Sequence, residues 1–258
     1  MFLRVLLYEE PFNQHYNIGF DEALLESVLK RSTQYPILRI WRNSRTVVLG
    51  ALSRISDEVN LEFVDRNGIV LARRISGGGT VYHDLGNINY TLVIDKSRHD
   101  KSRLIGVDYL YKRLLKGLIY SLEYLGVEPN NIRIANSSDI VVGDFKVSGN
   151  ASVMRENTYL LHGTLLISAD MYLLKNSLII PPRNLKKKVD NVKYRVTNLT
   201  SILNTKIDYR NVIEALVNGF STLLNREPYF DLPSEYELNL GLKLFREKYS
   251  NPKWIYRK

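Results

Sequence analysis

The sequence RRISGGGTVYHDLGN, residues 73–87, is the stretch around which the chain is organised. Three consecutive glycines separate two segments with β-like composition, 68–74 and 88–94. Glycine lets a backbone approach a ligand closely and turn its N–H groups toward oxygen atoms, and the paired arginines can add bidentate positive charge. The pattern indicates a loop that binds a phosphate or carboxylate, although a glycine run is also typical of a flexible turn.

The same block, continued by Asn89-Tyr90-Thr91-Leu92, resembles the glycine-rich lipoate-binding loop of the lipoate-protein ligase A family, whose members are relatives of biotin protein ligases. In that family the loop wraps the lipoyl chain and the α-phosphate of a lipoyl-adenylate intermediate. The resemblance therefore implies that this loop contacts substrate. Its candidate site residues are Arg74, Ser76, Gly77, Gly78, Gly79, Val81, His83 and Asn87.

Composition sets the broad class of the protein. With 258 residues, 45% of them apolar, the chain is long enough to bury a core, and we expect a single domain. A formal charge of +9 favours an acidic partner, which includes nucleic acid, an anionic cofactor or an acidic protein surface. The lack of cysteine excludes disulfides, cysteine-rich zinc sites and thiol nucleophiles. No secretory signal or membrane-length apolar run is present, so a cytoplasmic protein is expected.

Periodicity predicts the secondary structure. Strands are expected at 3–8, 37–42, 46–51, 69–74, 88–94, 139–142, 145–151 and 159–167. Helices are expected at 17–30, 61–67, 104–125, 210–225 and 235–249. The strands on either side of Asn43-Ser44 should form a hairpin, the basic segment 181–196 a loop, and 227–229 a turn. This order predicts an α+β fold with a largely antiparallel central sheet flanked by helices, which the family resemblance also implies.

A second block contains the candidate catalytic lysine. Lys146 opens an alternating strand that ends in small residues, as close approach to a ligand requires, whereas a lysine in a polar turn is usually a surface charge. The block resembles the family's lysine strand, which implies that Lys146 contacts the lipoate carboxylate and the α-phosphate and that Asp139 orients it. A fixed cation there would stabilise the charge that develops on the phosphoryl oxygens. The same block adds the candidate contacts Ser148, Gly149 and Ala151.

Three further segments resemble family blocks. Trp41 lies in the segment that resembles the family's early hairpin, beside the lipoyl pocket, although alone it is typical of a core aromatic. His162, Gly163 and Thr164 lie in a segment similar to the strand beside the adenine, where His162 alone would be a core histidine. The block 190–199, which includes Arg195, resembles the loop that closes over the adenylate.

Cofactors and metals follow from the same reasoning. The four histidines have no metal-ligand spacing, so no protein metal site is expected. The resemblance implies lipoate and ATP as substrates. Any metal should be Mg²⁺ carried by the ATP phosphates.

The leading interpretation is an ATP-dependent lipoate-protein ligase that forms lipoyl-AMP and transfers the lipoyl group to a lysine. The acceptor would be a lipoyl domain of a 2-oxoacid dehydrogenase E2 protein or a glycine-cleavage H-type protein. The alternatives are a lipoyl or octanoyl transferase of the same superfamily, which employs a cysteine, and a basic nucleic-acid-binding protein. Biotin ligase fits the Ser-Gly-Gly-Gly loop less well.

The last matched block ends near Leu199, which bears on domain organisation. We expect residues 1–258 to form one catalytic domain without the separate C-terminal accessory domain that many family members carry. A second small polypeptide would then supply that domain, which makes this chain the large subunit of a bipartite ligase. A self-sufficient short ligase is the competing possibility.

Overall fold

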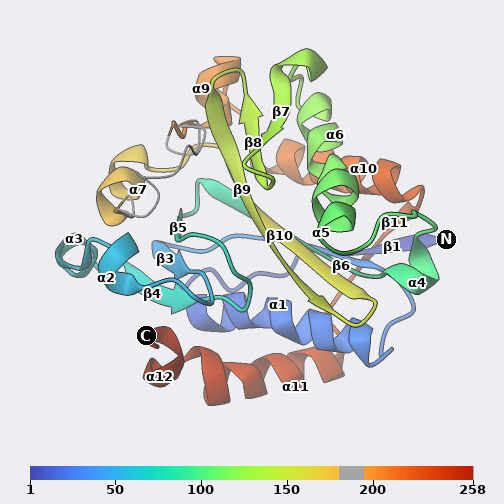
Figure 1. The fold of residues 1–258 in the computed structure, drawn as a ribbon, viewed down its shortest axis with the longest axis horizontal. Helices are drawn as coiled ribbons and strands as arrows, with labels where there is room; N and C mark the ends of the chain where they lie inside the picture. Colours follow the sequence, from blue (N-terminus) through green and yellow to red (C-terminus); the bar gives the residue numbers. More distant parts are fainter. Residues whose placement is uncertain (180–194, 258) are drawn as a thin grey trace.

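The computed structural model describes residues 1–179 and 195–257. Its main feature is an eight-stranded sheet with the order β11-β1-β2-β6-β10-β9-β8-β7, and a three-stranded sheet has the order β4-β3-β5 (Figure 1). The strands are β1 (Phe2–Leu6), β2 (Ile37–Trp41), β3 (Thr46–Leu49), β4 (Val70–Arg73), β5 (Val81–His83), β6 (Asn87–Asp95), β7 (Ile132–Ala135), β8 (Asp139–Val142), β9 (Phe145–Arg155), β10 (Thr158–Leu166) and β11 (Glu227–Asp231).

Helices cover both faces of the large sheet. In Figure 1, α6 and α10 lie on one side of it, while α1 and α11 lie on the other. The helices are α1 (Gln14–Leu29), α2 (Ile55–Glu58), α3 (Leu61–Arg66), α4 (Lys96–His99), α5 (Gly106–Asp108), α6 (Lys116–Tyr124), α7 (Met171–Ser177), α9 (Leu199–Leu203), α10 (Tyr209–Leu224), α11 (Glu235–Leu244) and α12 (Pro252–Ile255). Within the described ranges, no helix combines the length and apolar character needed to cross a membrane.

Strand β6 shows how the sheet positions the site. Alternate side chains on a strand point to opposite faces. Ile88, Tyr90 and Leu92 join the core under α6 and α10. The residues between them, Asn89 and Thr91, are polar and buried, on the face that α1 covers. Because polar groups are costly to bury without partners, these two positions indicate that this part of the interior serves a site.

The predicted fold class is confirmed, since the sheet is mixed but largely antiparallel. From β2 to β7 every neighbouring pair is antiparallel, whereas β1 pairs in parallel with both β2 and β11. Most predicted strands and helices are present with ends shifted by a few residues.

Several local predictions are wrong. Strands β2 and β3 do not form a hairpin, because β2 pairs with β1 and β6 while β3 joins the small sheet. The expected turn 227–229 belongs to β11, and β5 and β7 were not predicted. The helix expected at 104–125 contains a π-helical turn at Tyr109–Leu114, and Val107, which fits the apolar stripe by spacing, is exposed.

The basic loop expected at 181–196 lies mostly outside the described residues. At its end, Val196 forms a parallel bridge with Lys146. The Lys146 N–H donates to the Arg195 carbonyl at 2.8 Å, and the Thr197 N–H donates to the Lys146 carbonyl at 3.1 Å. The end of this segment is therefore attached to the strand of the candidate lysine.

Candidate active site

A cavity of about 200 Å³ opens on the α1 side of the large sheet, between the sheet and the glycine loop. A row of neighbouring residues crosses its floor. Trp41 on β2 is opposite Asn89 on β6, Asn89 is opposite Thr164 on β10, Thr164 is opposite Gly149 on β9, and Gly149 is opposite Asp139 on β8. All five line the cavity. Residues that are distant in sequence thus form one continuous surface because five strands are adjacent.

Arg74 braces the glycine loop that forms one wall of the cavity. Its Nη2 donates to the carbonyls of Gly77 at 2.6 Å and Gly79 at 2.8 Å, and its Nε donates to Ser76 Oγ at 2.9 Å. Gly78, between these carbonyls, has φ +87°, a backbone conformation that residues other than glycine rarely adopt. Burial lowers the pKa of the Arg74 guanidinium to about 10, so the side chain remains charged at neutral pH. Arg74 therefore fixes the shape of the loop.

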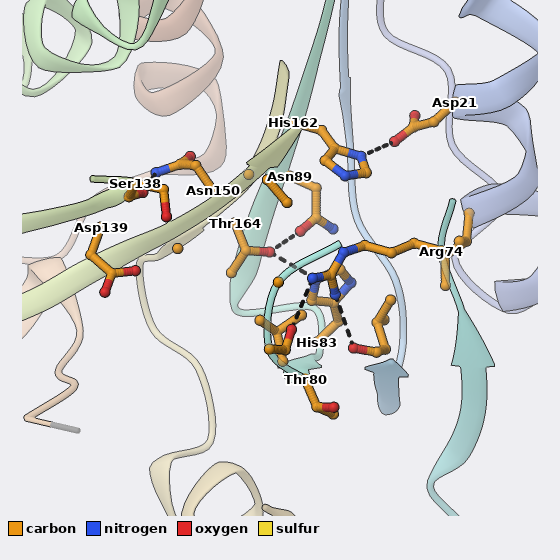
Figure 2. Close-up of a pocket in the computed structure, with 18 of the residues that line it drawn as sticks. Asp21, Arg74, Thr80, His83, Asn89, Ser138, Asp139, Asn150, His162 and Thr164 are labelled. Atoms are coloured by element: carbon orange, nitrogen blue, oxygen red, sulfur yellow. Dashed lines mark hydrogen bonds and ion pairs between the residues drawn. The ribbon is translucent and has the colours of Figure 1, made fainter. Parts of the chain in front are cut away.

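A chain of buried hydrogen bonds connects Ser76 to helix α1. Ser76 Oγ lies 2.6 Å from His162 Nε2. His162 Nδ1 lies 2.8 Å from Asp21 Oδ2 (Figure 2). Because the carboxylate only accepts, Nδ1 donates to it, and in a neutral ring Nε2 then accepts a hydrogen bond from the Ser76 hydroxyl. Asp21 Oδ1 also accepts from Arg39 Nη1 at 2.9 Å and from Thr91 Oγ1 at 2.8 Å. The Asp21 carboxylate thus accepts three hydrogen bonds and holds this wall of the cavity in place.

Lys146 and Asp139 form the charged pair on the other side. Lys146 Nζ lies 2.7 Å from Asp139 Oδ1, with the two side chains 15% and 7% exposed. A Cβ atom at Gly149 would lie 3.1 Å from that ammonium, so glycine there leaves room for the lysine side chain. Asn136, whose backbone has a left-handed conformation, donates to Asp139 Oδ2 at 3.3 Å. An ammonium held by a carboxylate beside a cavity is suited to binding an anion.

His83, Thr164 and Asn89 form a small polar cluster between these two walls. His83 Nε2 lies 2.9 Å from Thr164 Oγ1, which donates to Asn89 Oδ1. Burial, together with the charge of Arg74, lowers the pKa of His83 to about 3, so the ring is neutral at physiological pH. Trp41 packs against His83 in an edge-on arrangement with 5.9 Å between ring centroids. Apolar and polar lining therefore meet at His83.

Most of the residues predicted from sequence line this cavity, including Trp41, His162 and both members of the lysine–aspartate pair. The residues predicted to contact substrate that do not line it are Ser76, Gly77, Asn87, Ser148 and Arg195.

The surroundings of four of these five residues differ from what a substrate contact requires. Ser76 is buried behind the loop against His162, and the Asn87 amide donates to the Tyr82 carbonyl at 2.8 Å. Ser148 is buried, with its hydroxyl 3.3 Å from Asn150 Oδ1. Arg195 is exposed.

Sequence reasoning missed a second set of lining residues. They are Ile18, Asp21, Val48, Thr80, Asn89, Asn136, Ser138 and Asn150. Asp21 carried a usable signal, because an acid on the apolar face of a predicted helix requires a buried partner. Asn89 carried another, because it interrupts a strand whose neighbours are apolar. In the described part of the chain, no group of three or more His, Cys, Asp or Glu side chains is arranged to hold a metal ion.

Comparisons with known proteins agree with this geometry. The lipoyl protein ligase A/B catalytic domain family matches residues 13–221. Lipoate-protein ligase A subunit 1 of Thermoplasma acidophilum is 33% identical over 262 residues, which cover 97% of this chain and 95% of that protein. A solved structure describes the lipoylation system of the same archaeon, a bipartite lipoate protein ligase and its E2 lipoyl domain. The matching chain of that structure is 32% identical to this chain with a TM-score of 0.83, and the match covers 99% of this chain and 96% of that chain. A crystal structure of a lipoate-protein ligase A bound with ATP is 33% identical with a TM-score of 0.82, covering 99% of each chain.

Proposed function

The chain belongs to the lipoyl protein ligase A/B catalytic domain family, and we propose that it is an ATP-dependent lipoate-protein ligase. In the first step, a lipoate carboxylate oxygen attacks the α-phosphorus of ATP and pyrophosphate leaves, which gives lipoyl-AMP. In the second step, the neutral amine of an acceptor lysine attacks the acyl carbonyl. An amide forms, AMP leaves, and the amine loses a proton.

The observation that carries the proposal is the Lys146–Asp139 ion pair at 2.7 Å in the cavity. Bringing a carboxylate to a phosphate places two anions together, and positive charge held in position lowers that barrier. The Lys146 ammonium would contact the lipoate carboxylate and the α-phosphate in the first step. In the second step it would polarise the acyl carbonyl. Asp139 would keep the ammonium oriented between the two steps.

The glycine loop supports phosphate binding at the same place. Arg74 engages the carbonyls of Gly77 and Gly79. In a planar trans peptide the N–H points away from the C=O. The Gly78 N–H is therefore directed away from the guanidinium, as binding of an anionic oxygen requires. The Thr80 N–H donates instead to Glu58 Oε2 at 2.9 Å, which anchors the end of the loop.

Mg²⁺ is part of the proposal as the ion that accompanies the ATP phosphates. Asp21 and Asp139 are the acidic residues that line the cavity among the described residues. Asp21 is occupied by Arg39, Thr91 and His162. Asp139 is engaged as well, by Lys146 at Oδ1 and by Asn136 at Oδ2, so the ion would be held mainly by the ATP phosphates, which fits the preference of Mg²⁺ for few carboxylates together with substrate phosphates. Bound there, the ion would neutralise phosphate charge.

We also propose that the acceptor is a lipoyl domain, of the E2 or glycine-cleavage H type, and that a second polypeptide completes the ligase. The support is the relative from Thermoplasma acidophilum named as subunit 1, which this chain matches over 95% of its length. The related solved structure is described as a bipartite ligase with an E2 lipoyl domain. Full activity of the purified chain alone, from lipoate and ATP, would contradict the need for a second polypeptide.

Mass spectrometry of the acceptor tests the function. A purified lipoyl domain incubated with this protein and preformed lipoyl-AMP should gain the mass of one lipoyl group. Incubation with lipoyl-AMP alone is the control for spontaneous acylation. An unchanged rate with the protein present would refute the proposed function. The competing cysteine-dependent transferase is disfavoured because the sequence contains no cysteine.

A further inference from the structure

Asn89 and His83, at the cavity, each have a buried polar atom without a hydrogen-bond partner among the described residues. The two residues are 1% and 6% exposed, and both line the cavity. The Thr164 hydroxyl donates to the amide oxygen of Asn89, so the Asn89 amide nitrogen is turned away from that hydroxyl (Figure 2). Across residues 1–179 and 195–257, neither Asn89 Nδ2 nor His83 Nδ1 has a hydrogen-bond partner. Buried polar groups are normally satisfied, so these atoms are candidates for ligand contact.

The sheet register fixes the position of Asn89 relative to Lys146. The ammonium lies beside Gly149, and Thr164, Asn89 and Trp41 follow on successive strands. Neighbouring strands are about 4.8 Å apart, so Asn89 lies roughly 10 Å along this row from Gly149 and Trp41 roughly 14 Å.

A lipoyl chain has the length to reach Asn89. Five carbon–carbon bonds of about 1.5 Å join the carboxyl carbon to the first ring carbon, so the sulfur atoms lie roughly 7 to 9 Å from the carboxyl carbon. With the carboxylate in contact with Lys146, the dithiolane ring then lies at Asn89, before Trp41. Ile18, Trp41 and Val48 supply apolar lining for the tail.

We propose that Asn89 selects a sulfur-bearing acyl tail over an all-carbon tail, an inference that rests on the proposed ligase function. The Asn89 Nδ2–H donates to a ring sulfur, which is a weak acceptor and highly polarisable. A saturated alkyl tail in the same place offers no acceptor, so the buried donor stays unpaired. Transfer of the lipoyl group is therefore favoured over transfer of acyl groups such as octanoyl.

The test compares two acyl groups of similar shape, lipoyl and 5-cyclopentylpentanoyl, in which a carbon ring replaces the dithiolane. Both are supplied as preformed adenylates, so the result does not depend on a second polypeptide. We expect wild-type kcat/KM for transfer to a lipoyl domain to favour lipoyl by about tenfold, the size expected for one buried donor that loses its acceptor. In Asn89→Leu, which is similar in size but has no donor, the ratio should fall to within about twofold of unity.

Asn43→Leu is the matched control. Asn43 is also fully buried, and within the described residues its amide nitrogen also lacks a partner, but the residue does not line the cavity. Its ratio should remain that of the wild type. A wild-type ratio near one would overturn the selection proposal even if Asn89→Leu failed to fold, as would an unchanged ratio in a folded Asn89→Leu. Transfer of neither acyl group would instead refute the ligase function.

Discussion

Two ion pairs next to the cavity are built differently. Arg39 and Asp21 are 2.9 Å apart and 0% and 3% exposed, and Asp21 has two further hydrogen-bond donors. Lys146 and Asp139 are 2.7 Å apart, but the lysine is 15% exposed and lines the cavity. A buried pair whose carboxylate accepts three hydrogen bonds holds a structure in place, whereas a cation at a cavity wall is accessible to a ligand. The same type of interaction therefore serves the scaffold on one side and chemistry on the other.

The contrast predicts the largest effect for Asp21→Asn, measured as the free energy of unfolding. The substitution leaves the Arg39 charge buried without its counter-ion, so we expect a loss of about 3 to 5 kcal/mol in urea or thermal unfolding. Asp139→Asn is the matched control and should cost less than Asp21→Asn, because its partner lysine is partly exposed at the cavity whereas Arg39 is fully buried. Equal losses in the two variants would contradict the distinction between the pairs.

Lys146→Ala should affect the transfer rate far more than the stability of the fold. We expect lipoyl transfer from lipoyl-AMP to slow by about 100- to 1,000-fold, the usual effect of removing one electrostatic contact to the transition state. Its circular dichroism should match that of the wild type, and its loss of stability should be smaller than that of Asp21→Asn. Lys112→Ala removes an exposed lysine that pairs with Asp108 at 3.0 Å on a helix surface, and its activity should be unchanged. An active Lys146→Ala protein would remove the proposed mechanism.

The sequence predicted the elements whose pattern is local. Strand β6 was predicted because alternate residues face two different layers, with Ile88, Tyr90 and Leu92 on one of them. Strand β11 was missed because it is largely exposed, includes Pro228 and, among the described strands, pairs only with β1 at the other end of the chain. The β2–β3 hairpin was predicted from proximity in sequence, but residues 42–45 take the chain from one sheet to the other.

The site was predictable to a similar degree. The glycine loop and Lys146 lie in contiguous blocks, so a resemblance to a family identified them. Asp21 was missed because its partners, Arg39, Thr91 and His162, come from three different strands. Arg74 was predicted to contact substrate; it lines the cavity, and it also donates to the loop carbonyls, which the motif alone did not indicate. A motif identifies the residues of a loop. Which of those residues brace the loop and which contact the ligand depends on tertiary packing.

The smallest expected effect is a change in KM at Gly78, which distinguishes the shape of the glycine loop from a general effect of backbone strain. Gly78 and Gly68 both have positive φ, +87° and +60°, so alanine at either position should cost about 1 to 2 kcal/mol of stability. A Cβ at Gly78 would lie 3.2 Å from Arg74 Nη2, whereas a Cβ at Gly68 would have no described atom within 4 Å. Gly78→Ala should therefore displace the braced loop and raise the KM for lipoyl-AMP by roughly tenfold, with a smaller change in the KM for the acceptor domain. Gly68→Ala should lose similar stability and retain both KM values. If the two variants changed the KM for lipoyl-AMP equally, the effect would come from lost stability, and the bracing role assigned to Arg74 would be wrong.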